Sequence, residues 1–376
     1  MKNPFEKKAF VALADGTILR GHSFGALVDG PGEVIFNTGM TGYEEILTDP
    51  SYKGQIVTLT YPEIGNTGFN PEDYESEKIQ ANGLIVCNYN EPSNFRATES
   101  LAQALQKAGV PAVYGIDTRA LTSKLRSEGS QKGYICVTGK LSESDGVRLA
   151  AEWEGLDGKD YASLVSTKKT YVWGKDRSAD GFLSPVTATA DLRIVAYDFG
   201  VKYNILRHMQ AVGMEVTVVP AATPAEDVLA MKPDGVFLSN GPADPAAVTY
   251  AVENIRKLLG KVPLMGICLG HQLLGTALGG KTCRLKFGHH GCNHPVMDLR
   301  TRAVAITSQN HNFMVDSGTL DETIVEITHV NLNDNTVEGL SHRTHKAFSV
   351  QYHPEAAPGP NDAVDLFTAF RAMIKR

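Results

Sequence analysis

The chain has few cysteines and no long apolar run. Its five cysteines are an odd number, lie far apart and include no CxxC pair, which favours reduced thiols over a disulfide framework. No apolar run approaches membrane-spanning length, and the short apolar stretch near the start is too short for the core of a signal peptide. We therefore expect a cytoplasmic protein that does not contact a membrane.

A strong excess of one charge is also missing. The net charge is -6, with acidic and basic residues interspersed, so no basic stripe indicates nucleic-acid binding. We expect small molecules or other proteins as partners. At 376 residues and 42% hydrophobic content, the chain is long enough for two cores, and we expect two domains.

The order of predicted elements divides the chain into an α+β domain, residues 1–152, a connecting segment, 153–190, and an α/β domain, 191–376. The first domain has short β-like runs at 10–13, 55–60 and 83–87, and one clear helix from near Ser100 to near Gly109. The connecting segment mixes Gly, Lys, Asp, Ser and Thr with little periodicity.

The last domain alternates strands and helices. Apolar strands are predicted at 194–197, 215–219, 235–238 and 262–265, helices lie between them, and Asn361 is a plausible N-cap for a closing helix. This alternation predicts a doubly wound, mainly parallel sheet, in which ligands bind at the carboxyl ends of the strands.

The most informative segment is Gly266-Ile267-Cys268-Leu269-Gly270. It places a cysteine at a tight turn between an apolar strand and a stretch with helical periodicity, as in a nucleophile elbow. The glycines on either side allow close backbone approach. A helix N-terminus beside the sulfur favours the thiolate. We therefore predict that Cys268 is a nucleophile.

A proton acceptor for this nucleophile is predicted in Gln351-Tyr352-His353-Pro354-Glu355. In an extended segment, residues two apart project to the same side, so Glu355 can orient the imidazole of His353. An isolated His-Pro-Glu is more often an ordinary surface turn, but the upstream cysteine elbow favours the catalytic interpretation.

Acyl transfer also needs N–H donors for the developing oxyanion. The amide of Leu269, directly after the nucleophile, is one candidate. The second is Gly241, in the turn that follows the strand at 235–238, although an ordinary Gly-Pro turn explains this segment equally well.

A Cys/His-rich patch invites a metal interpretation. Its spacing fits no standard zinc-ligand pattern, so we predict hydrogen-bonded histidines in a glycine-rich loop and no metal. The patch comprises Cys283, His289, His290, Cys292 and His294. We also predict that Cys87 and Cys136 are core thiols.

Together, the cysteine elbow, the His-Pro-Glu segment and the Ser239-Asn240-Gly241-Pro242 turn resemble a class I glutamine amidotransferase. Other segments resemble the small, glutamine-hydrolysing subunit of carbamoyl-phosphate synthetase, and this resemblance covers nearly the whole chain. These segments are 36–43, 49–52, 59–62, 115–119 and 287–291.

The resemblance implies that Cys268 attacks the side-chain amide of glutamine. His353, oriented by Glu355, would shuttle the proton that releases ammonia, and water would then cleave the thioester to glutamate. It implies glutamine-binding positions at Ser51, Gly241, Ala243, Leu269, Gln272, Asn310, Asn312 and Phe313.

Two of these positions depart from the family pattern, because Ala243 and Asn312 replace the usual glycines. The side chains are tolerated there only if φ is not strongly positive. Cys292 also stands where glycine is common, and we assign its thiol no function. Ser51 lies in the other domain, so the resemblance implies that glutamine binds across the two domains.

The resemblance further implies a large, ATP-using partner subunit, in a heterodimer or a higher assembly, that forms carbamoyl phosphate from bicarbonate for arginine and pyrimidine biosynthesis. We expect ATP and Mg²⁺ on that partner, and no phosphate-binding loop or cofactor in this chain. Two alternatives stay open. One is a catalytically silent regulatory subunit, motivated by Ala243 and Asn312, and the other is a different cysteine hydrolase such as a peptidase or a γ-glutamyl hydrolase.

Overall fold

The computed structural model describes residues 7–177, 189–242 and 244–376. The chain divides into two compact units, Met1–Asp157 and Gly158–Arg376. This division falls within the segment 153–190 that was predicted to connect the domains. In the described part of the chain, no helix has both the length and the apolar content needed to cross a membrane.

The first unit is built on a closed barrel with parallel and antiparallel pairs. The parallel succession β3-β4-β6-β8 is completed by antiparallel pairing through β9, β1 and β2. The barrel strands are β1 (Lys8–Leu13), β2 (Ile18–Ser23), β3 (Gly30–Asn37), β4 (Gln55–Leu59), β6 (Gly83–Ile85), β8 (Ala112–Tyr114) and β9 (Gln131–Cys136). A separate short pair joins β5 (Glu63–Ile64) to β7 (Asn88–Tyr89).

Helices of the first unit lie between these strands in the chain. They are α1 (Tyr43–Thr48), α2 (Leu101–Ala108), α3 (Thr118–Glu128) and α4 (Glu143–Glu152), with 3-10 turns η1 (Pro50–Tyr52) and η2 (Pro71–Asp73). The sequence prediction for α2 is confirmed. Ser100 and Gln103 form a capping box at its start, and Gly109 ends it with φ 70.

The second unit contains a ten-stranded sheet in the order β10-β12-β11-β13-β14-β19-β18-β17-β15-β16. Five neighbouring strands from β12 to β19 pair in parallel. They are β11 (Leu192–Asp198), β12 (Met214–Pro220), β13 (Gly235–Leu238), β14 (Leu264–Ile267) and β19 (Ala347–Val350). The predicted doubly wound parallel sheet is therefore confirmed for this part of the unit.

Antiparallel strands extend this sheet at both edges, which the sequence analysis did not predict. They are β10 (Tyr171–Val172) at one edge, and β15 (Lys281–Asp298), β16 (Val304–Asp316), β17 (Val325–Asn331) and β18 (Val337–His342) at the other. The longest pair is β15 and β16. The Cys/His patch was predicted to be a glycine-rich loop, but it lies in β15, and β16 carries three of the implied glutamine-binding positions.

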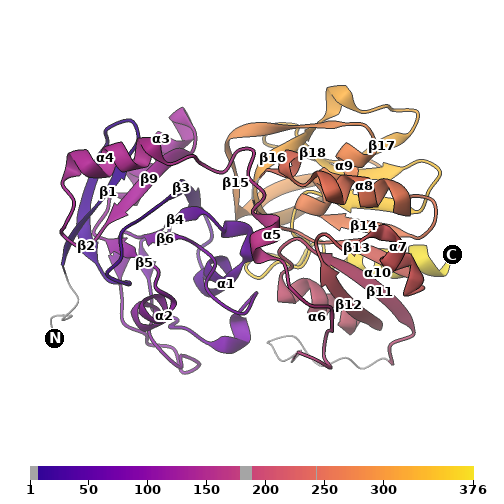
Figure 1. Ribbon diagram of the computed structural model, residues 1–376, viewed down its shortest axis with the longest axis horizontal. Helices are drawn as coiled ribbons and strands as arrows, with labels where there is room; N and C mark the ends of the chain where they lie inside the picture. The colour runs from indigo at the N-terminus through magenta and orange to yellow at the C-terminus, as the bar shows by residue number, and fades with distance from the viewer. Residues whose placement is uncertain (1–6, 178–188, 243) are drawn as a thin grey trace. The chain divides into compact units, whose positions relative to one another are not determined.

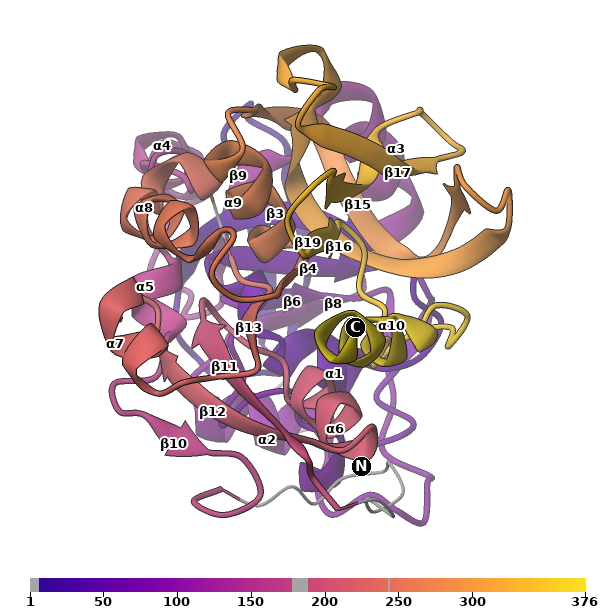
Figure 2. The same cartoon turned by 90° about the vertical axis from the view of Figure 1, so that its right-hand side faces the viewer.

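Helices cover both faces of the parallel strands (Figure 1). The helices are α5 (Ala162–Val165), α6 (Tyr203–Ala211), α7 (Ala225–Ala230), α8 (Thr249–Leu258), α9 (Leu269–Ala277) and α10 (Asp365–Lys375), with η3 (Pro245–Ala247) and η4 (Ser317–Thr319). On β11, Val195 and Tyr197 pack in one core with α7, α8 and α9, while Ile194 and Ala196 pack in the other with α6 and α10 (Figure 2). This alternation of faces along one strand is the signature of a sheet buried on both sides.

One cap prediction is wrong. Helix α10 begins at Asp365 after Val364, with no side-chain cap, so Asn361 does not start it. The packing of Phe367 and Phe370 into the core fixes this helix instead.

Three neighbouring parallel strands direct the chain toward one edge of the sheet. The turn at 239–242 follows β13, Cys268 follows β14, and His353 lies shortly after the end of β19. The carboxyl ends of parallel strands form the usual ligand-binding edge of such a sheet. The candidate site is therefore placed by the topology.

Candidate active site

Cys268 occupies a strained turn between β14 and α9. Its φ is 53 and its ψ is -105, a conformation that costs a non-glycine residue on the order of 1–3 kcal/mol and is concentrated at functional sites. A Cβ at Gly266 would lie 2.7 Å from the carbonyl oxygen of Gly270, and one at Gly270 would lie 2.2 Å from that of Leu238. The glycines flanking the cysteine are thus required by backbone packing.

The Cys268 side chain is buried at the start of a helix. It is 2% exposed, and its Sγ lies 3.6 Å from the carbonyl oxygen of Asn310 on β16. Leu269 is the first residue of α9, so its N–H has no acceptor within the helix. A sulfur and a helix N-terminal amide on adjacent residues suit attack on a carbonyl carbon with stabilisation of the resulting oxyanion.

His353 and Glu355 form a buried pair. His353 Nδ1 lies 2.7 Å from Glu355 Oε1, and the backbone N–H of His353 donates to the carbonyl of Ser308 at 2.9 Å. Burial lowers the pKa of His353, but the Glu355 carboxylate and the nearby Cys268 outweigh burial and raise it above the ordinary value. The arrangement favours an imidazolium beside the sulfur, which is the state that stabilises a thiolate.

Lys202 contacts Glu355 at the candidate site, and the sequence analysis missed it. Its Nζ lies 3.0 Å from Glu355 Oε1, the oxygen that also faces His353, and donates to the carbonyl of Ala356 at 2.5 Å. Burial raises the pKa of Glu355, but Lys202 and then His353 hold it below the ordinary value. A lysine just before a helix carries no sequence signal for this role, because lysines are usually exposed.

Asn204, on the first turn of α6, holds the same segment. Its Nδ2 donates to the carbonyl oxygen of Glu355 at 2.5 Å. Ala356 and Ala357 follow with φ of 53 and 50, a left-handed backbone that disfavours side chains. The turn that carries the His353 and Glu355 pair is therefore held by Lys202, just before α6, and by Asn204, in its first turn.

Gly241 lies in close backbone packing at the end of the turn after β13. A Cβ there would be 2.2 Å from the carbonyl oxygen of Phe199 and 2.9 Å from Leu269 Cδ2. Its proximity to Leu269 places both predicted oxyanion donors in one region. Ala243 lies outside the described residues.

The implied glutamine-binding residues on α9 and β16 are connected by hydrogen bonds. Gln272 Nε2 donates to the carbonyl oxygen of Phe313 at 2.7 Å and to Gln351 Oε1 at 3.1 Å. His290 contacts Asn310 Oδ1 and Asn312 Oδ1, each at 3.0 Å. Hydrogen bonds from α9 and β15 therefore hold β16, the strand whose Asn310 carbonyl faces Cys268.

Asn312 lies within β16 and is not among the residues with positive φ. The backbone at Asn312 can therefore carry a side chain, because its φ is not positive. In the first unit, Ser51 lies in η1, where its backbone N–H donates to Asp49 Oδ1 at 2.8 Å. A role for Ser51 in binding glutamine stays a prediction.

The other cysteines differ from Cys268 in their surroundings. Cys136 is 3% exposed, and burial raises the pKa of its thiol to about 12, which makes it a poor nucleophile. Cys87 is only partly buried, so the prediction of a core thiol does not hold for it. Cys292 Sγ contacts the carbonyl of Pro358 at 3.5 Å.

The sequence does contain the letters of a phosphate-binding loop, Gly275–Thr282, which the sequence prediction overlooked. A functional loop of this kind follows a strand and precedes a helix. Here Gly275 lies in α9, and Lys281 and Thr282 begin β15. The order is the reverse, so the segment lacks the geometry that cradles phosphate.

Comparison with known proteins gives matches over both units. Residues 195–373 match the family model described as Glutamine amidotransferase class-I, and residues 11–135 match the one described as Carbamoyl-phosphate synthase small chain, CPSase domain.

Three similar relatives are each named carbamoyl phosphate synthase small chain. The protein of Syntrophotalea carbinolica is 52% identical over 374 residues, covering 98% of this chain and 98% of the relative. That of Akkermansia muciniphila is 52% identical over 368 residues, covering 98% and 97%. That of Thermosynechococcus vestitus is 53% identical over 371 residues, covering 98% and 96%.

Proposed function

Because the chain belongs to the family of carbamoyl phosphate synthase small chains, we propose that it hydrolyses glutamine and supplies the ammonia to a large synthetase subunit. The observation that carries this proposal is the strained, buried Cys268 at a strand-to-helix turn, together with the His353 and Glu355 pair. The proposed reaction is acyl transfer from the side-chain amide of glutamine.

In the first step the Cys268 thiolate attacks the amide carbon, and the carbonyl oxygen takes up the negative charge. The amides of Leu269 and Gly241 are the proposed donors to this oxyanion. The carbon–nitrogen bond then breaks, and His353 gives its proton to the leaving nitrogen, which departs as ammonia. A thioester between Cys268 and the glutamyl group is left.

In the second step water attacks the thioester. His353 removes a proton from this water as the water attacks the thioester carbon. The carbon–sulfur bond then breaks and glutamate leaves, which restores the Cys268 thiolate beside a protonated His353 imidazole. Glu355 keeps the imidazole in its working orientation throughout, and Lys202 balances the buried carboxylate. We propose that ATP and Mg²⁺ act on the large subunit, where bicarbonate and ammonia become carbamoyl phosphate.

The test uses the chain in complex with its large subunit. Cys268→Ser is expected to abolish glutamine-dependent carbamoyl phosphate synthesis and glutamate release, while synthesis from added ammonia stays intact. Cys283→Ser is the matched control and is expected to behave as the wild type. Full glutaminase activity in the Cys268→Ser variant would overturn the mechanism.

A labelling experiment separates this function from a silent regulatory subunit and from a different hydrolase. A glutamine-like electrophile is expected to modify Cys268, with protection by free glutamine. No labelling of Cys268 would indicate a silent subunit. Turnover of peptides or polyglutamyl substrates without turnover of free glutamine would indicate another hydrolase.

A further inference from the structure

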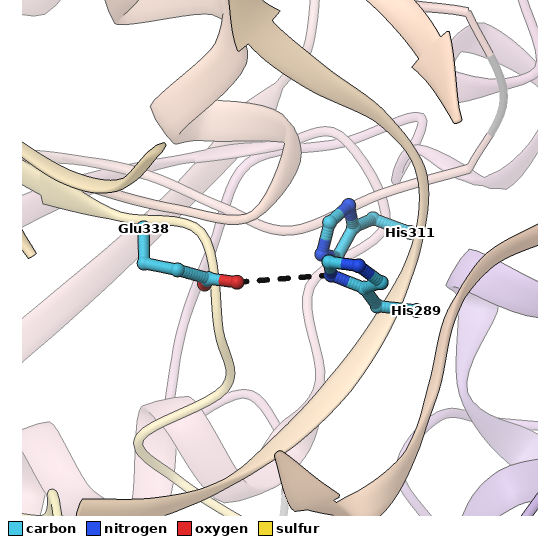
Figure 3. A group of neighbouring side chains, drawn as sticks. All are labelled: His289, His311 and Glu338. Atoms are coloured by element: carbon cyan, nitrogen blue, oxygen red, sulfur yellow. Dashed lines mark ion pairs between the residues drawn. The ribbon is translucent and has the colours of Figure 1, made fainter. Parts of the chain in front are cut away.

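A buried group of histidine and carboxylate side chains lies in the antiparallel part of the second unit, separate from the Cys268, His353 and Glu355 triad. It consists of His289 on β15, His311 on β16 and Glu338 on β18, and we call it the His-Glu cluster (Figure 3). All three residues are buried, and one ligand atom from each lies within 4.8 Å of the other two. The cluster has no part in the proposed glutaminase chemistry.

The strand register brings the cluster together. His289 and His311 are directly paired across β15 and β16, and their rings meet edge to face with centroids 4.9 Å apart. Directly opposed residues in an antiparallel pair share one face of the sheet. His289 Nδ1 faces Glu338 Oε1 at 3.7 Å, so three strands contribute to one small volume.

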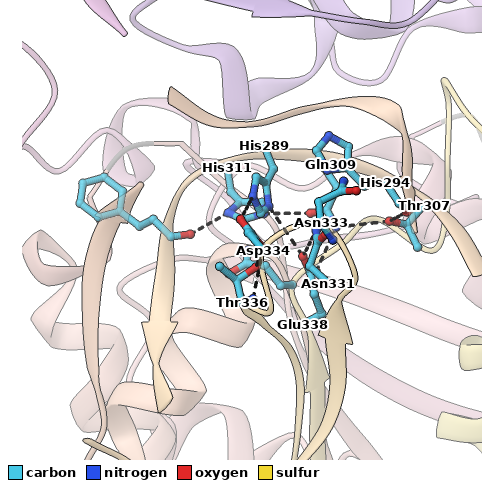
Figure 4. Close-up of polar contacts among 12 residues, drawn as sticks. His289, His294, Thr307, Gln309, His311, Asn331, Asn333, Asp334, Thr336 and Glu338 are labelled. Atoms are coloured by element: carbon cyan, nitrogen blue, oxygen red, sulfur yellow. Dashed lines mark hydrogen bonds and ion pairs between the residues drawn. The ribbon is translucent and has the colours of Figure 1, made fainter. Parts of the chain in front are cut away.

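Each imidazole is anchored through the nitrogen that points away from the centre of the cluster. His289 Nε2 lies 2.8 Å from Asp334 Oδ2, and His311 Nδ1 lies 2.7 Å from the carbonyl oxygen of Phe313 (Figure 4). Metal-bound histidines characteristically donate their second N–H to a carboxylate or a backbone carbonyl in this way. Both rings are therefore oriented as metal ligands are.

His289 Nδ1 is the clearest unsatisfied atom of the cluster. His289 is 5% exposed, and within the described residues its Nδ1 is buried and makes no hydrogen bond. Buried polar atoms are nearly always paired with protein, water or an ion. A nitrogen that lies 3.7 Å from a buried carboxylate needs a positive group between them, either the proton of an imidazolium or a metal ion.

The hydrogen bonds around His311 are also one proton or one metal ion short. Because Nδ1–H donates to a carbonyl, Nε2 of a neutral ring is an acceptor, yet it faces Gln309 Oε1 at 2.8 Å. Turning the Gln309 amide removes this conflict but brings Oε1 against Glu338 Oε2, which now accepts from Gln309 Nε2 at 3.0 Å. Either orientation of the amide leaves two acceptors in contact.

We propose that the His-Glu cluster binds a zinc ion through His289 Nδ1, His311 Nε2, a carboxylate oxygen of Glu338 and the amide oxygen of Gln309. The ion would sit where the lone pairs converge, so it removes both conflicts at once. Imidazole nitrogens and a carboxylate oxygen are usual donors to tetrahedral Zn²⁺, and the amide oxygen of Gln309 would complete the four protein ligands. Tetrahedral zinc ligands lie about 3.4 Å apart. The ligand atoms of His289, His311 and Glu338, which lie within 4.8 Å of one another, must each move inward by less than about 1 Å, and Gln309 Oε1, now 2.8 Å from His311 Nε2, must move slightly away from it.

This set differs from the Cys/His patch of the sequence analysis. Of the five residues in that patch, only His289 belongs to the cluster, and the other ligands come from β16 and β18. The expectation of no metal was based on the spacing of residues along the sequence. That spacing does not show which residues strand pairing brings together. With every coordination position filled by protein, the site is structural.

A structural ion here would fix the strand that faces Cys268. It ties β15, β16 and β18 together, and β16 carries the Asn310 carbonyl that lies 3.6 Å from Cys268 Sγ. The Phe313 carbonyl that anchors His311 also accepts from Gln272. The zinc site is thus a support for the implied glutamine-binding strand.

The experiment measures zinc itself. The full chain is stripped with a chelator, equilibrated with Zn²⁺ and desalted, and its zinc content is determined by mass spectrometry. One equivalent per chain is expected for the wild type. His289→Ala and Glu338→Gln are expected to lose it, whereas His345→Ala, at an exposed histidine, is the matched control and keeps it.

Glu338→Gln keeps the test meaningful if His289→Ala fails to fold. A glutamine at 338 has an N–H group that satisfies the hydrogen-bond chain without a cation, so this variant should fold and lack zinc. Asp334→Asn, which alters only the anchor of His289, should weaken zinc binding about 10- to 100-fold. Retention of zinc in both Glu338→Gln and His289→Ala would overturn the proposal, as would a folded wild-type chain that takes up none.

Cobalt substitution identifies the donor atoms. The Co²⁺ form should show tetrahedral d–d bands without a thiolate charge-transfer band, since the proposed ligands are nitrogen and oxygen. A thiolate band would place the ion on a cysteine and overturn the assignment. These readouts do not depend on glutaminase activity, so their failure leaves the proposed function untouched.

Discussion

Replacing Lys202 by methionine removes the cation that neutralises the buried Glu355 while keeping the aliphatic volume. Lys202 and Glu355 have side chains that are 3% and 0% exposed, so the change leaves a carboxylate with no access to water. Among the described residues, His353 then remains as the positive partner of that carboxylate. The carbonyl of Ala356 also loses the donor at 2.5 Å.

The expected cost follows from burial. Breaking a fully buried ion pair by removing one partner destabilises a protein by about 3–5 kcal/mol, because an uncompensated charge remains inside. Since His353 still faces Glu355, we expect the lower end, about 3 kcal/mol. A displaced Glu355 also misplaces the imidazole, and a 1 Å error in such a group can cost about 100-fold in rate.

Urea unfolding of the second unit measures the loss. Trp173 is a suitable reporter because its ring lies 5.0 Å from that of Tyr203, the residue after Lys202. A Trp153→Phe background removes the other tryptophan, which belongs to the first unit. The midpoint of the transition should fall for Lys202→Met, and glutamine hydrolysis by the folded variant should fall with it.

A surface ion pair provides the control. Lys375 contacts Asp191, and their side chains are 48% and 46% exposed, so Lys375→Met should unfold close to the wild type because exposed pairs contribute little. If Lys202→Met loses no more stability than Lys375→Met, the reasoning from burial is refuted. A large loss of stability with unchanged turnover would refute the link between Lys202 and the triad.

Three further outcomes are expected. Gly241→Ala should reduce glutamine hydrolysis by roughly 100-fold, because the new Cβ would lie 2.2 Å from the Phe199 carbonyl oxygen; wild-type kinetics would contradict a tight turn there. Asn204→Asp removes the donor to the Glu355 carbonyl and should lower kcat about 5- to 150-fold, equivalent to about 1–3 kcal/mol, while KM changes little; an effect on KM alone would argue against positioning. Burial raises the pKa of Glu44 from 4.5 to about 8, so between these pH values the folded state keeps a proton on Glu44 that the unfolded state has lost. The free energy of unfolding of the wild type should therefore fall as pH rises from about 4.5 to 8, by up to about 1.4 kcal/mol per pH unit. Glu44→Gln should flatten this dependence in urea unfolding at pH 5 and pH 8, and equal slopes would disprove the burial argument.

The sequence predicted local features whose causes are local. The elbow around Cys268 needs small residues on both sides of a turn, and helix α2 needs a polar cap before it and a glycine after it. Such requirements are met by neighbours in the chain, so spacing alone shows them. The two-residue spacing of His353 and Glu355 likewise places both groups on one side of an extended segment.

Other features depend on contacts between distant segments, and these escaped prediction. The antiparallel strands β15 to β18 were not predicted, because the alternation of strands and helices stops there. The sequence of a strand also does not show which other strand it pairs with. Lys202 and Asn204 gained their roles only when α6 packed under the turn after His353. The phosphate-loop letters at 275–282 show the converse, since a matching string has no such function when a helix precedes it.

The sequence by itself determined the parallel sheet, and it predicted Cys268 as the nucleophile and His353 as its proton acceptor at one edge of that sheet, because each follows from residue type, period and turn geometry over a few positions. Only the tertiary structure decided which charge balances Glu355, whether Asn312 is strained, and that His289, His311 and Glu338 meet. These depend on which strands pair, in what register, and on how much water burial removes. Which charged groups pair in a buried site depends on how distant segments pack, and the spacing of residues along the sequence does not show it.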